Sequence, residues 1–477
     1  MPFRLHNNCL VPWDSGAILP PVLPSRRLVL SRSSVLLAAG LALSCSDDKP
    51  TVENPSSLTG VEATAVSPRN VRIRWQPMAD AQVVIHRAAS GKGYQEVGRK
   101  DASHGRFLDL ALDPESSYTY RLTVCRNDAC EQPHQTGSVS TPASAFPSFD
   151  ITVPSVNPGD DVAVFGVYRI AAELFREGHM AAVDRTGRVI WEYETFEWGP
   201  ITEVQPLPDG TLATGQNQYL VHIDLDGTEL FRWTQTTARH DIDRLADGRW
   251  AFLYFDPFEV EGETRLGDGI AVLNPEGTAI EWQWAGREHI PWTDVNEEDL
   301  ATNELGLGQD WTHSNSITFD ETGSKVLLNV RNLNRIYKID VATQQVDWIM
   351  GDGGDFGEGI WDHSHDPQFL ADDRVLIFDN GYRRPSPQYS RVIEVEFDPS
   401  QKRAEIVWEY RETPDFYSFA LGSAQAMPNG NVLVTDGING RLVEVSRDKQ
   451  KVWELVIQKY YWSYKAVNVP RSFFTDW

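Results

Sequence analysis

Two histidines, His363 and His365, lie two residues apart in the segment WDHSHDPQF, between aromatic residues and aspartates. The chain has only 11 histidines among 477 residues, so such a pair is uncommon in it. Two further histidines precede or begin expected strands, His240 in RHDI and His313 in WTHSNS. An imidazole can bind a metal, attack as a nucleophile or transfer a proton. Any one of these histidines alone is more often an ordinary hydrogen-bonded residue, but several in similar positions favour a site.

An arginine near these histidines favours an anion over a metal. Three converging imidazoles are a known arrangement for catalytic zinc. However, Arg331, in LNVRN, lies on the expected strand that follows His313. A guanidinium stays charged and is a poor neighbour for a divalent cation, whereas its planar fork suits a tetrahedral oxyanion. The pattern therefore predicts an anion-binding site without a metal, and a metal-dependent hydrolase remains the alternative.

These residues belong to a region that repeats loosely over residues 149–477. In each copy a hydrophobic strand leads through a polar turn, often with glycine, to a second strand that closes on tryptophan. The closing tryptophans are spaced by 42, 49, 66, 60 and 45 residues, at Trp191, Trp233, Trp282, Trp348, Trp408 and Trp453. This spacing is near that of four-stranded propeller blades, so the six copies predict an all-β fold with a six-bladed β-propeller. Because a propeller gathers one inner strand from every blade at its axis, histidines from different repeats can meet there.

A smaller β-domain is predicted over residues 59–141. The segments VRIRW, which ends at Trp75, and YTYRLTV, which begins at Tyr118, alternate as strands do. LDPESSY, residues 112–118, resembles the tyrosine corner of fibronectin type III modules. We therefore expect an N-terminal fibronectin type III-like β-sandwich with Trp75 in its core, acting as a spacer or docking module. Cys125 and Cys130 could close a small loop in an oxidising compartment.

The first 45 residues carry an export signature. SRRLVL, residues 25–30, resembles a twin-arginine signal, and the apolar run 35–43 suits a signal peptide and is too short to span a bilayer. ALSCSDD, residues 42–48, resembles a loose lipobox with Cys45 as the lipidated residue. Residues 1–45 are therefore expected to be an export signal of the lipoprotein type, followed by a linker at 46–58. The protein is expected in the periplasm or cell envelope, with any membrane attachment through Cys45, and release after nearby cleavage is the alternative.

The composition excludes other classes. The chain contains 16 Trp, 15 Tyr and 20 Phe, which provide ample core material and are not typical of a disordered protein. Its formal net charge of -25 would repel a phosphate backbone, so nucleic acid is not an expected partner.

The order of the motifs resembles one family. WTHSNS (311–316), VRN (330–332), HD (365–366) and FDNG (378–381) resemble the bacterial aryl sulfotransferases that need no activated nucleotide donor, over residues 150–455. The resemblance implies a six-bladed propeller and a ping-pong reaction without a cofactor. A histidine would take a sulfuryl group from a phenolic sulfate ester and pass it to a second phenol.

The resemblance also implies roles for individual residues. Catalytic roles fall on His365, His313 and His240, and substrate-binding roles on Arg331 and Asn315, with Arg384 as a further substrate-binding candidate. His365, which directly precedes an aspartate, matches the nucleophile, and His363 is the second choice. Ser423 and Gln425 are further candidates among the late polar residues.

General chemistry supports these residue types. A neutral imidazole, with a usual pKa of about 6.5, has a free lone pair at neutral pH and can attack sulfur. The acceptor phenol, with a pKa of about 10, needs a general base, for which His240 or His313 is expected. Trp311, Trp361 and Tyr417 could stack on the aryl groups or simply pack within the blades. A non-catalytic propeller that binds a partner outside the cytoplasm is the second interpretation of the whole chain.

Overall fold

The computed structural model describes residues 57–127, 129–169, 178–195, 201–216, 219–234, 238–300, 306 and 308–477. The export signal expected at residues 1–45 and nearly all of the linker expected at 46–58 lie outside the described residues. Contacts divide the chain into residues 1–52 and 53–477, and the second unit contains the whole described structure. In that described part, strands predominate and no helix is both long and apolar enough to cross a membrane.

Two antiparallel sheets form the N-terminal part of this unit. One contains β1 (Glu62–Ser67), β2 (Asn70–Arg74) and β5 (Arg106–Asp109). The other contains β4 (Gln95–Asp101), β3 (Gln82–Ala89) and β6 (Ser117–Arg126), with the short strands β7 (Ala129–Cys130), β8 (His134–Gln135) and β9 (Val139–Ser140). Alternate residues of β2 and β6 are buried in one apolar cluster, as their sequence pattern predicts.

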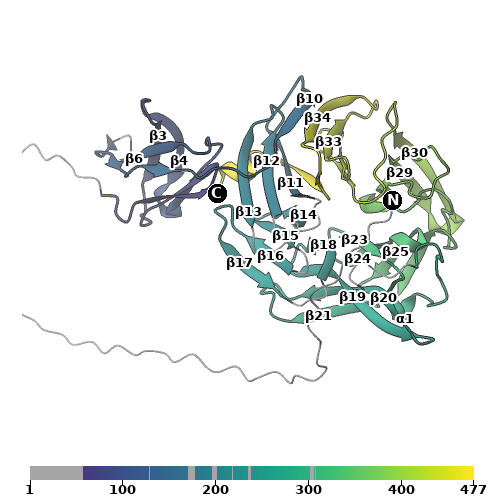
Figure 1. Cartoon of the computed structure of the whole chain (residues 1–477). Coiled ribbons are helices and arrows are strands. Elements are labelled where there is room, and N and C mark those ends of the chain that lie inside the picture. Colours follow the sequence, from purple (N-terminus) through teal and green to yellow (C-terminus); the bar gives the residue numbers. More distant parts are fainter. Residues whose placement is uncertain are drawn as a thin grey trace, which may run out of the picture. The chain divides into compact units, whose positions relative to one another are not determined.

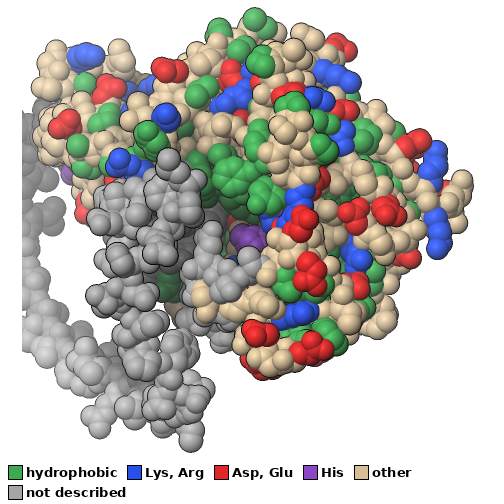
Figure 2. Space-filling model, turned by 45° about the vertical axis from the view of Figure 1, so that its right-hand side comes forward, with side chains coloured by type: hydrophobic (Ala, Val, Ile, Leu, Met, Phe, Trp, Pro, Cys, Tyr) green, Lys and Arg blue, Asp and Glu red, His purple; other side chains and the backbone are tan. Residues whose placement is uncertain are grey.

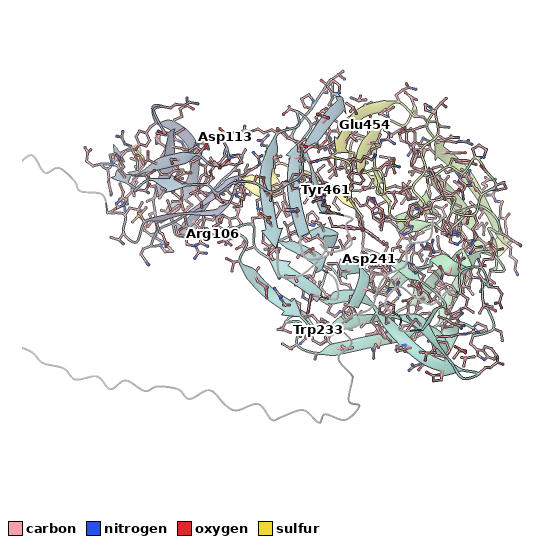
Figure 3. All side chains as sticks on the ribbon, viewed as in Figure 1. Arg106, Asp113, Trp233, Asp241, Glu454 and Tyr461 are labelled. Carbon is pink, nitrogen blue, oxygen red and sulfur yellow. A yellow bond between two sulfur atoms is a disulfide. The ribbon has the colours of Figure 1, made fainter. Side chains whose placement is uncertain are left out.

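Three contacts of this domain involve residues that the sequence analysis singled out. Trp75 is buried in the apolar cluster, and its Nε1 donates a hydrogen bond of 2.9 Å to the carbonyl of Ala102. The backbone N–H of Asp113, labelled in Figure 3, donates to the hydroxyl of Tyr118 at 2.9 Å. Cys125 and Cys130 form a disulfide. The core position of Trp75 and the pairing of the two cysteines are therefore confirmed.

From Phe149 onward, the described residues form six mainly antiparallel sheets of four or five strands. Their consecutive strands are β11 (Asp161–Arg169), β12 (Gly178–Asp184) and β13 (Val189–Thr195); β14 (Ile201–Pro206), β15 (Leu212–Gln216), β16 (Tyr219–Ile223) and β17 (Glu229–Trp233); β18 (Ala238–Arg244), β19 (Trp250–Val260), β20 (Glu263–Leu273) and β21 (Ile280–Ala285); β23 (Ser314–Phe319), β24 (Lys325–Val330), β25 (Arg335–Asp340) and β26 (Val346–Gly351); β27 (His365–Ala371), β28 (Arg374–Asp379), β29 (Arg391–Asp398) and β30 (Arg403–Tyr410); and β31 (Ser423–Ala426), β32 (Val432–Asp436), β33 (Arg441–Val445) and β34 (Lys451–Ile457).

The smaller elements complete these sheets or connect them. β22 (Gln309–Asp310) pairs with β20, and β35 (Tyr461–Trp462) pairs with β11. Three 3-10 turns and two single-turn helices complete the assignment: η1 (Ala102–His104), η2 (Arg331–Leu333), η3 (Pro399–Gln401), α1 (Gly286–His289) and α2 (Ser472–Thr475).

Strands from opposite ends of this region close the sheets into a ring. β36 (Ala466–Pro470) pairs with β11 of the first sheet, and β10 (Phe149–Val153) pairs with β34 of the last. The innermost strands β14, β18, β23, β27, β31 and β36 contact one another in this order, and β36 contacts β14 again. Figure 1 shows the sheets following one another around a common centre. The fold is therefore all-β and propeller-like, with the starts of the inner strands near one axis.

Four of the six repeated tryptophans link neighbouring sheets. The Nε1 of Trp191 donates to the carbonyl of Leu225 at 2.7 Å, that of Trp282 to Val341 at 2.8 Å, and that of Trp408 to Arg447 at 3.0 Å. Each acceptor lies in a turn of the next sheet. Trp453, which is fully buried, donates to the carbonyl of Arg185 in the first sheet at 3.1 Å, so the same contact also joins the last sheet to the first. Trp233, labelled in Figure 3, ends β17 at the corresponding position.

Ion pairs join the N-terminal sheets to the second sheet of the ring, β14–β17. Arg72 and Arg74 each contact Asp226 at 3.0 Å, and Arg106 contacts Asp224 at 2.8 Å. The guanidinium of Arg106 also lies 4.2 Å from the ring centre of Trp477, whose Nε1 donates to Asp224. These contacts make the small domain part of the same compact unit.

Candidate active site

The site histidines stand where inner strands begin. His240 lies in β18, His313 immediately precedes β23, and His365 is the first residue of β27. The backbone φ is 54° at His240, 43° at His313, 56° at His363 and 50° at Asp366. Residues other than glycine seldom adopt this left-handed conformation, which costs about 1–3 kcal/mol where the side chain does not suit it. The surrounding contacts therefore hold the backbone at these strand starts in an unusual conformation, as is common at functional sites.

Three sheets and the C-terminal region bring their side chains together. The ring centres of His240 and His313 are 5.0 Å apart. The ring of Tyr464, just before β36, lies 6.4 Å from His240 and 6.1 Å from His365. In the space-filling view, a histidine side chain is visible in a hollow beside hydrophobic and basic side chains (Figure 2). The structure thus collects His240, His313 and His365 around one buried tyrosine.

Asn380 determines which nitrogen of His365 carries the proton. The Nδ1 of His365 lies 2.7 Å from Oδ1 of Asn380, whose Nδ2 donates to the carbonyls of Ser418 and Leu421 at 2.8 Å each. Because the amide nitrogen faces two acceptors, the amide oxygen must face the histidine, and His365 Nδ1–H is the donor. In this neutral tautomer Nε2 carries the lone pair. Burial and the nearby guanidinium of Arg331 lower the pKa of His365 to about 3, so the ring is neutral at physiological pH.

His363 has the opposite environment. Its Nε2 lies 2.8 Å from a carboxylate oxygen of Asp299, and its Nδ1 contacts the carboxylate of Asp362. Burial lowers its pKa, but the hydrogen bonds to the two carboxylates outweigh burial and leave the pKa raised. Both ring nitrogens are therefore donors, and neither has a lone pair for attack. The geometry favours His365 over His363 as a nucleophile.

His313 and His240 are also in defined states. Asp310 accepts from Nδ1 of His313, which leaves Nε2 as the basic nitrogen. Arg239 can only donate, so its contact with Nε2 of His240 makes that nitrogen an acceptor and leaves Nδ1–H as the donor. Burial and the charge of Arg239 lower the pKa of both imidazoles well below the usual value. His313 is thus arranged as a base and His240 as a hydrogen-bond donor.

Two guanidinium groups give the site its positive potential. Arg331 is largely buried, burial lowers its pKa, and it forms no ion pair with any carboxylate among the described residues. Its Nη1 donates to the side chain of Asn332 at 2.8 Å. Arg239 lies 3.2 Å from Asp268, and its buried Nε has no hydrogen-bond partner in the described part of the chain. A buried guanidinium whose charge and N–H groups are only partly paired within the protein favours an anionic ligand.

The remaining predicted site residues have other contacts. Asn315 is fully buried; its amide donates to the carbonyl of Ser364 at 2.9 Å and accepts from Asn329 at 2.7 Å, so it positions the segment that carries His365. The guanidinium of Arg384 contacts Asp379 and the carbonyl of Tyr389, and the structure does not join it to the histidines. Two more candidates bond elsewhere, Ser423 to Thr435 at 3.0 Å and Gln425 to the backbone of Asn468 at 2.6 Å.

An aromatic pocket adjoins Arg331. It has a volume of about 670 Å³ and is lined by Glu298, Tyr382, Arg383, Gln388, Tyr417 and Phe419. The guanidinium of Arg331 lies 5.2 Å from the ring centre of Tyr382, which links the pocket to the site. Tyr417 is therefore placed where an aryl group could stack. Trp311 and Trp361 instead are buried in apolar clusters of the sheets, so the packing interpretation applies to them.

Sequence reasoning missed several contributing residues. Arg239 and Asn380 stand inside the quoted motifs, but a single sequence does not show that their side chains contact His240 and His365. Tyr464 and Lys465 follow the last closing tryptophan and carry no recognisable motif. Only ring closure through β36 brings them to the axis. Within the described residues, no group of three or more His, Cys, Asp or Glu side chains has a metal-binding arrangement.

The arylsulfotransferase (ASST) family matches residues 166–470, and the chain belongs to this family. The predicted family resemblance is thus confirmed. No curated protein matches the chain significantly.

Similar solved structures include a protein of unknown function from Bacteroides caccae, with 14% identity and a TM-score of 0.44, covering 65% of this chain and 99% of that one. A streptogramin B lyase has 12% identity and a TM-score of 0.38, with coverage of 66% and 90%. The WD40 domain of Neurospora crassa Pan2 has 8% identity and a TM-score of 0.36, with coverage of 64% and 78%.

Proposed function

We propose that this protein transfers a sulfuryl group from a phenolic sulfate ester to a phenolic acceptor by a ping-pong mechanism, with His365 as the nucleophile. Family membership supports aryl sulfotransferase activity and aryl sulfate and phenol as substrates. The observation that carries the mechanism is the fixed tautomer of His365, whose Nδ1–H is bound by Asn380 while Nε2 is left for attack. A neutral imidazole in this state needs no prior deprotonation.

In the first half-reaction, Nε2 of His365 attacks the sulfur of the donor. The N–S bond forms as the bond from sulfur to the aryl oxygen breaks, and the phenolate leaves with the electron pair. The proton stays on Nδ1, where the neutral amide of Asn380 accepts its hydrogen bond and cannot remove it. The sulfohistidine is therefore an N-protonated imidazole, which is a good leaving group for the second step.

In the second half-reaction, the acceptor phenol loses its proton to Nε2 of His313. The phenol oxygen attacks sulfur, the N–S bond breaks, and its electron pair returns to Nε2 of His365. Asp310, at Nδ1 of His313, keeps that ring in the required tautomer and stabilises the imidazolium that forms. The proton on His313 then passes to solvent or to the next leaving phenolate, so atoms and charges balance over one cycle.

The cationic groups hold the sulfuryl oxygens during both steps. Arg331 has further N–H groups besides the one that binds Asn332, which could hold two oxygens, and His240 Nδ1–H can donate to a third.

The position of the aromatic pocket supports aryl substrates. Tyr382 and Tyr417 line it beside Arg331, so a phenyl ring could stack there while its ester sulfate reaches the guanidinium. The pocket carries both Arg383 and Glu298, which contact each other. We expect small uncharged or monoanionic phenols to be accepted best.

We also propose the fold of each domain and the location of the protein in the cell. The six consecutive sheets support a six-bladed propeller over residues 149–477. The two-sheet domain with Trp75 and the Tyr118 contact supports a fibronectin type III-like module at 59–141. From the sequence of residues 1–45, we propose export to the periplasm or cell envelope with lipidation at Cys45.

The function is tested with a chromogenic aryl sulfate and an added phenol. We expect phenol to stimulate release of the chromogenic phenol in the wild-type protein and expect His365→Ala to abolish it. His363→Gln, at the neighbouring histidine that has no free nitrogen, should retain release if it folds. A folded wild-type protein that releases no phenol with any phenolic acceptor would contradict the proposal.

A further inference from the structure

Lys465 is a buried lysine close to the aspartates that follow two site histidines, and it takes no part in the proposed chemical steps. Lys465, the residue before β36, places its ammonium 3.1 Å from Oδ1 of Asp366 and 3.2 Å from Oε1 of Glu203. The two carboxylates come from β27 and β14, on different sheets. A third carboxylate, that of Asp241 in β18, raises the pKa of Lys465 through its charge. One ammonium thus faces acids from three inner strands.

Two of these acids directly follow site histidines. Asp366 follows His365, and Asp241 follows His240. Asp366 has a left-handed φ of 50°, and besides Lys465 its carboxylate accepts from Gln368 at 2.9 Å and from the backbone N–H of Ala424. Anchoring the side chain of Asp366 therefore fixes the backbone that presents His365. Asp241, labelled in Figure 3, accepts from the backbone N–H of Ile317 at 2.8 Å and so ties β18 to β23.

Electrostatics require a cation at this position. Burial raises the pKa of Glu203, Asp241 and Asp366, with Asp241 reaching about 7. Without a positive charge, the three carboxylates would repel each other or take up protons, and their contacts with the strand starts would weaken. Burial lowers the pKa of Lys465, but the three acids outweigh it and leave the pKa raised, so the ammonium is retained.

We propose that Lys465 is a positioning residue for sulfuryl transfer, which fixes the strand starts that carry His365 and His240 by binding the carboxylates beside them. This inference rests on the proposed function for its catalytic consequence. Its structural consequence, the fixed imidazole of His365, can be measured without any turnover. Tyr464 extends the same connection, since its hydroxyl donates to the carbonyl of Asn315 at 2.7 Å.

The chain provides a matched control in Lys338. Lys338 and Lys465 both line a cavity of about 1070 Å³ that runs along later residues of the inner strands. The ammonium of Lys338 lies 5.9 Å from the ring centre of Trp348 and 5.7 Å from that of Phe369. No carboxylate pairs with it among the described residues. Lys338→Met therefore removes one positive charge from the same cavity without touching the acids beside the histidines.

The experiment compares Lys465→Met, Asp366→Asn, the double variant and Lys338→Met, each shown to be folded by circular dichroism. With a chromogenic aryl sulfate, Lys465→Met should lower kcat by roughly 10- to 100-fold, because small misplacements of a reacting group have effects of this size. The KM should change little, since Arg331 and Arg239 are untouched. The double variant should be no slower than the slower single variant, as expected when both residues act through one contact. Lys338→Met should have the same kcat and KM as the wild type.

The second readout is the Nδ1–H proton of His365 in ¹⁵N-histidine-labelled protein, assigned with His365→Gln. Its hydrogen bond to Asn380 should give a slowly exchanging signal in the wild type and in Lys338→Met. Lys465→Met should lose or broaden this signal. A folded Lys465→Met with the wild-type signal would overturn the proposal, even if no sulfuryl transfer were found. If the wild type gives the signal but no sulfuryl transfer, and Lys465→Met loses the signal, the proposed function is refuted and the positioning role is retained.

Discussion

Asn380 faces Nδ1 of His365 with its amide oxygen, because its amide nitrogen is already bound to the carbonyls of Ser418 and Leu421. The asparagine is fully buried and cannot rotate its amide without losing both of these hydrogen bonds. Asn380 therefore specifies the tautomer of the proposed nucleophile His365. Because its amide is neutral, it does not favour the charged form of the imidazole. His363, two residues away, is paired with carboxylates and is kept charged instead.

Replacing this amide with a carboxylate should change the pH dependence of the first half-reaction. In the wild type, the pKa of His365 is about 3, so the rate of phenol release in the pre-steady-state burst should be flat from pH 5 to 8. A carboxylate at Nδ1 favours the imidazolium and raises the pKa. Asn380→Asp should therefore show a burst rate that falls as the pH decreases below neutrality. A flat profile for this variant would contradict the assigned tautomer.

Arg331 should account for much of the affinity for the transition state. Removing a donor to a developing oxyanion typically costs about 3–4 kcal/mol, roughly 10²- to 10³-fold in rate. Arg331→Met should lower kcat/KM for an aryl sulfate by this factor. Arg331→Lys should recover only part of it, because an ammonium lacks the planar fork. The control is Arg374→Met, which removes an arginine that pairs with Glu396 on the outer part of its sheet and should change kcat/KM little.

His313 should act mainly on the acceptor. Loss of a general base typically slows its step by roughly 10²- to 10⁴-fold. His313→Gln should therefore slow phenol-dependent turnover by at least that lower factor and leave the burst of the first half-reaction within about tenfold of the wild type. The burial and nearby guanidinium groups that lower the pKa of His313 keep it neutral, so no acid limb near pH 6.5 is expected for the acceptor step. If His313→Gln slowed both half-reactions by the same factor, His313 would not be the general base for the acceptor.

The carboxylate contacts of His363 should stabilise the fold in a pH-dependent way. Because its pKa is raised above the unfolded value of about 6.5, the stabilisation is fully present below pH 6.5 and is lost as the pH rises through the folded pKa. His363→Gln should lower the free energy of unfolding by about 3 kcal/mol at pH 6, as for a broken buried ion pair, and by less at pH 9. Urea unfolding at both pH values measures this difference. His104→Gln, at an exposed histidine, should show neither effect.

The sequence predicted those parts of the fold that repeat at a regular spacing along the chain. The tryptophan spacing marked the repeats, and four of the six tryptophans, Trp191, Trp282, Trp408 and Trp453, link one sheet to the next. Closure through β36 left no comparable pattern, since a single strand near the chain's end pairs with β11 about 300 residues earlier in the chain.

The same distinction applies to the site. His240, His313 and His365 could be placed at strand starts from their motifs, and the structure brings them together. The choice between His363 and His365 depends on contacts with Asp299 and Asn380, which a single sequence does not show. Arg384 was selected by type and position alone, and its guanidinium is bound by Asp379 instead. Lys465 could not be selected at all, because its partners belong to three separate sheets.

Direct detection of the covalent intermediate tests the central claim. The wild-type protein would be mixed with an aryl sulfate without acceptor, quenched in alkali and digested, and the peptide containing His363 and His365 would be fragmented by mass spectrometry. The mechanism predicts one sulfuryl group on His365, lost when phenol is added before quenching and absent in His365→Gln. Phenol-dependent transfer without any modified histidine, or with the group on His363, would contradict it.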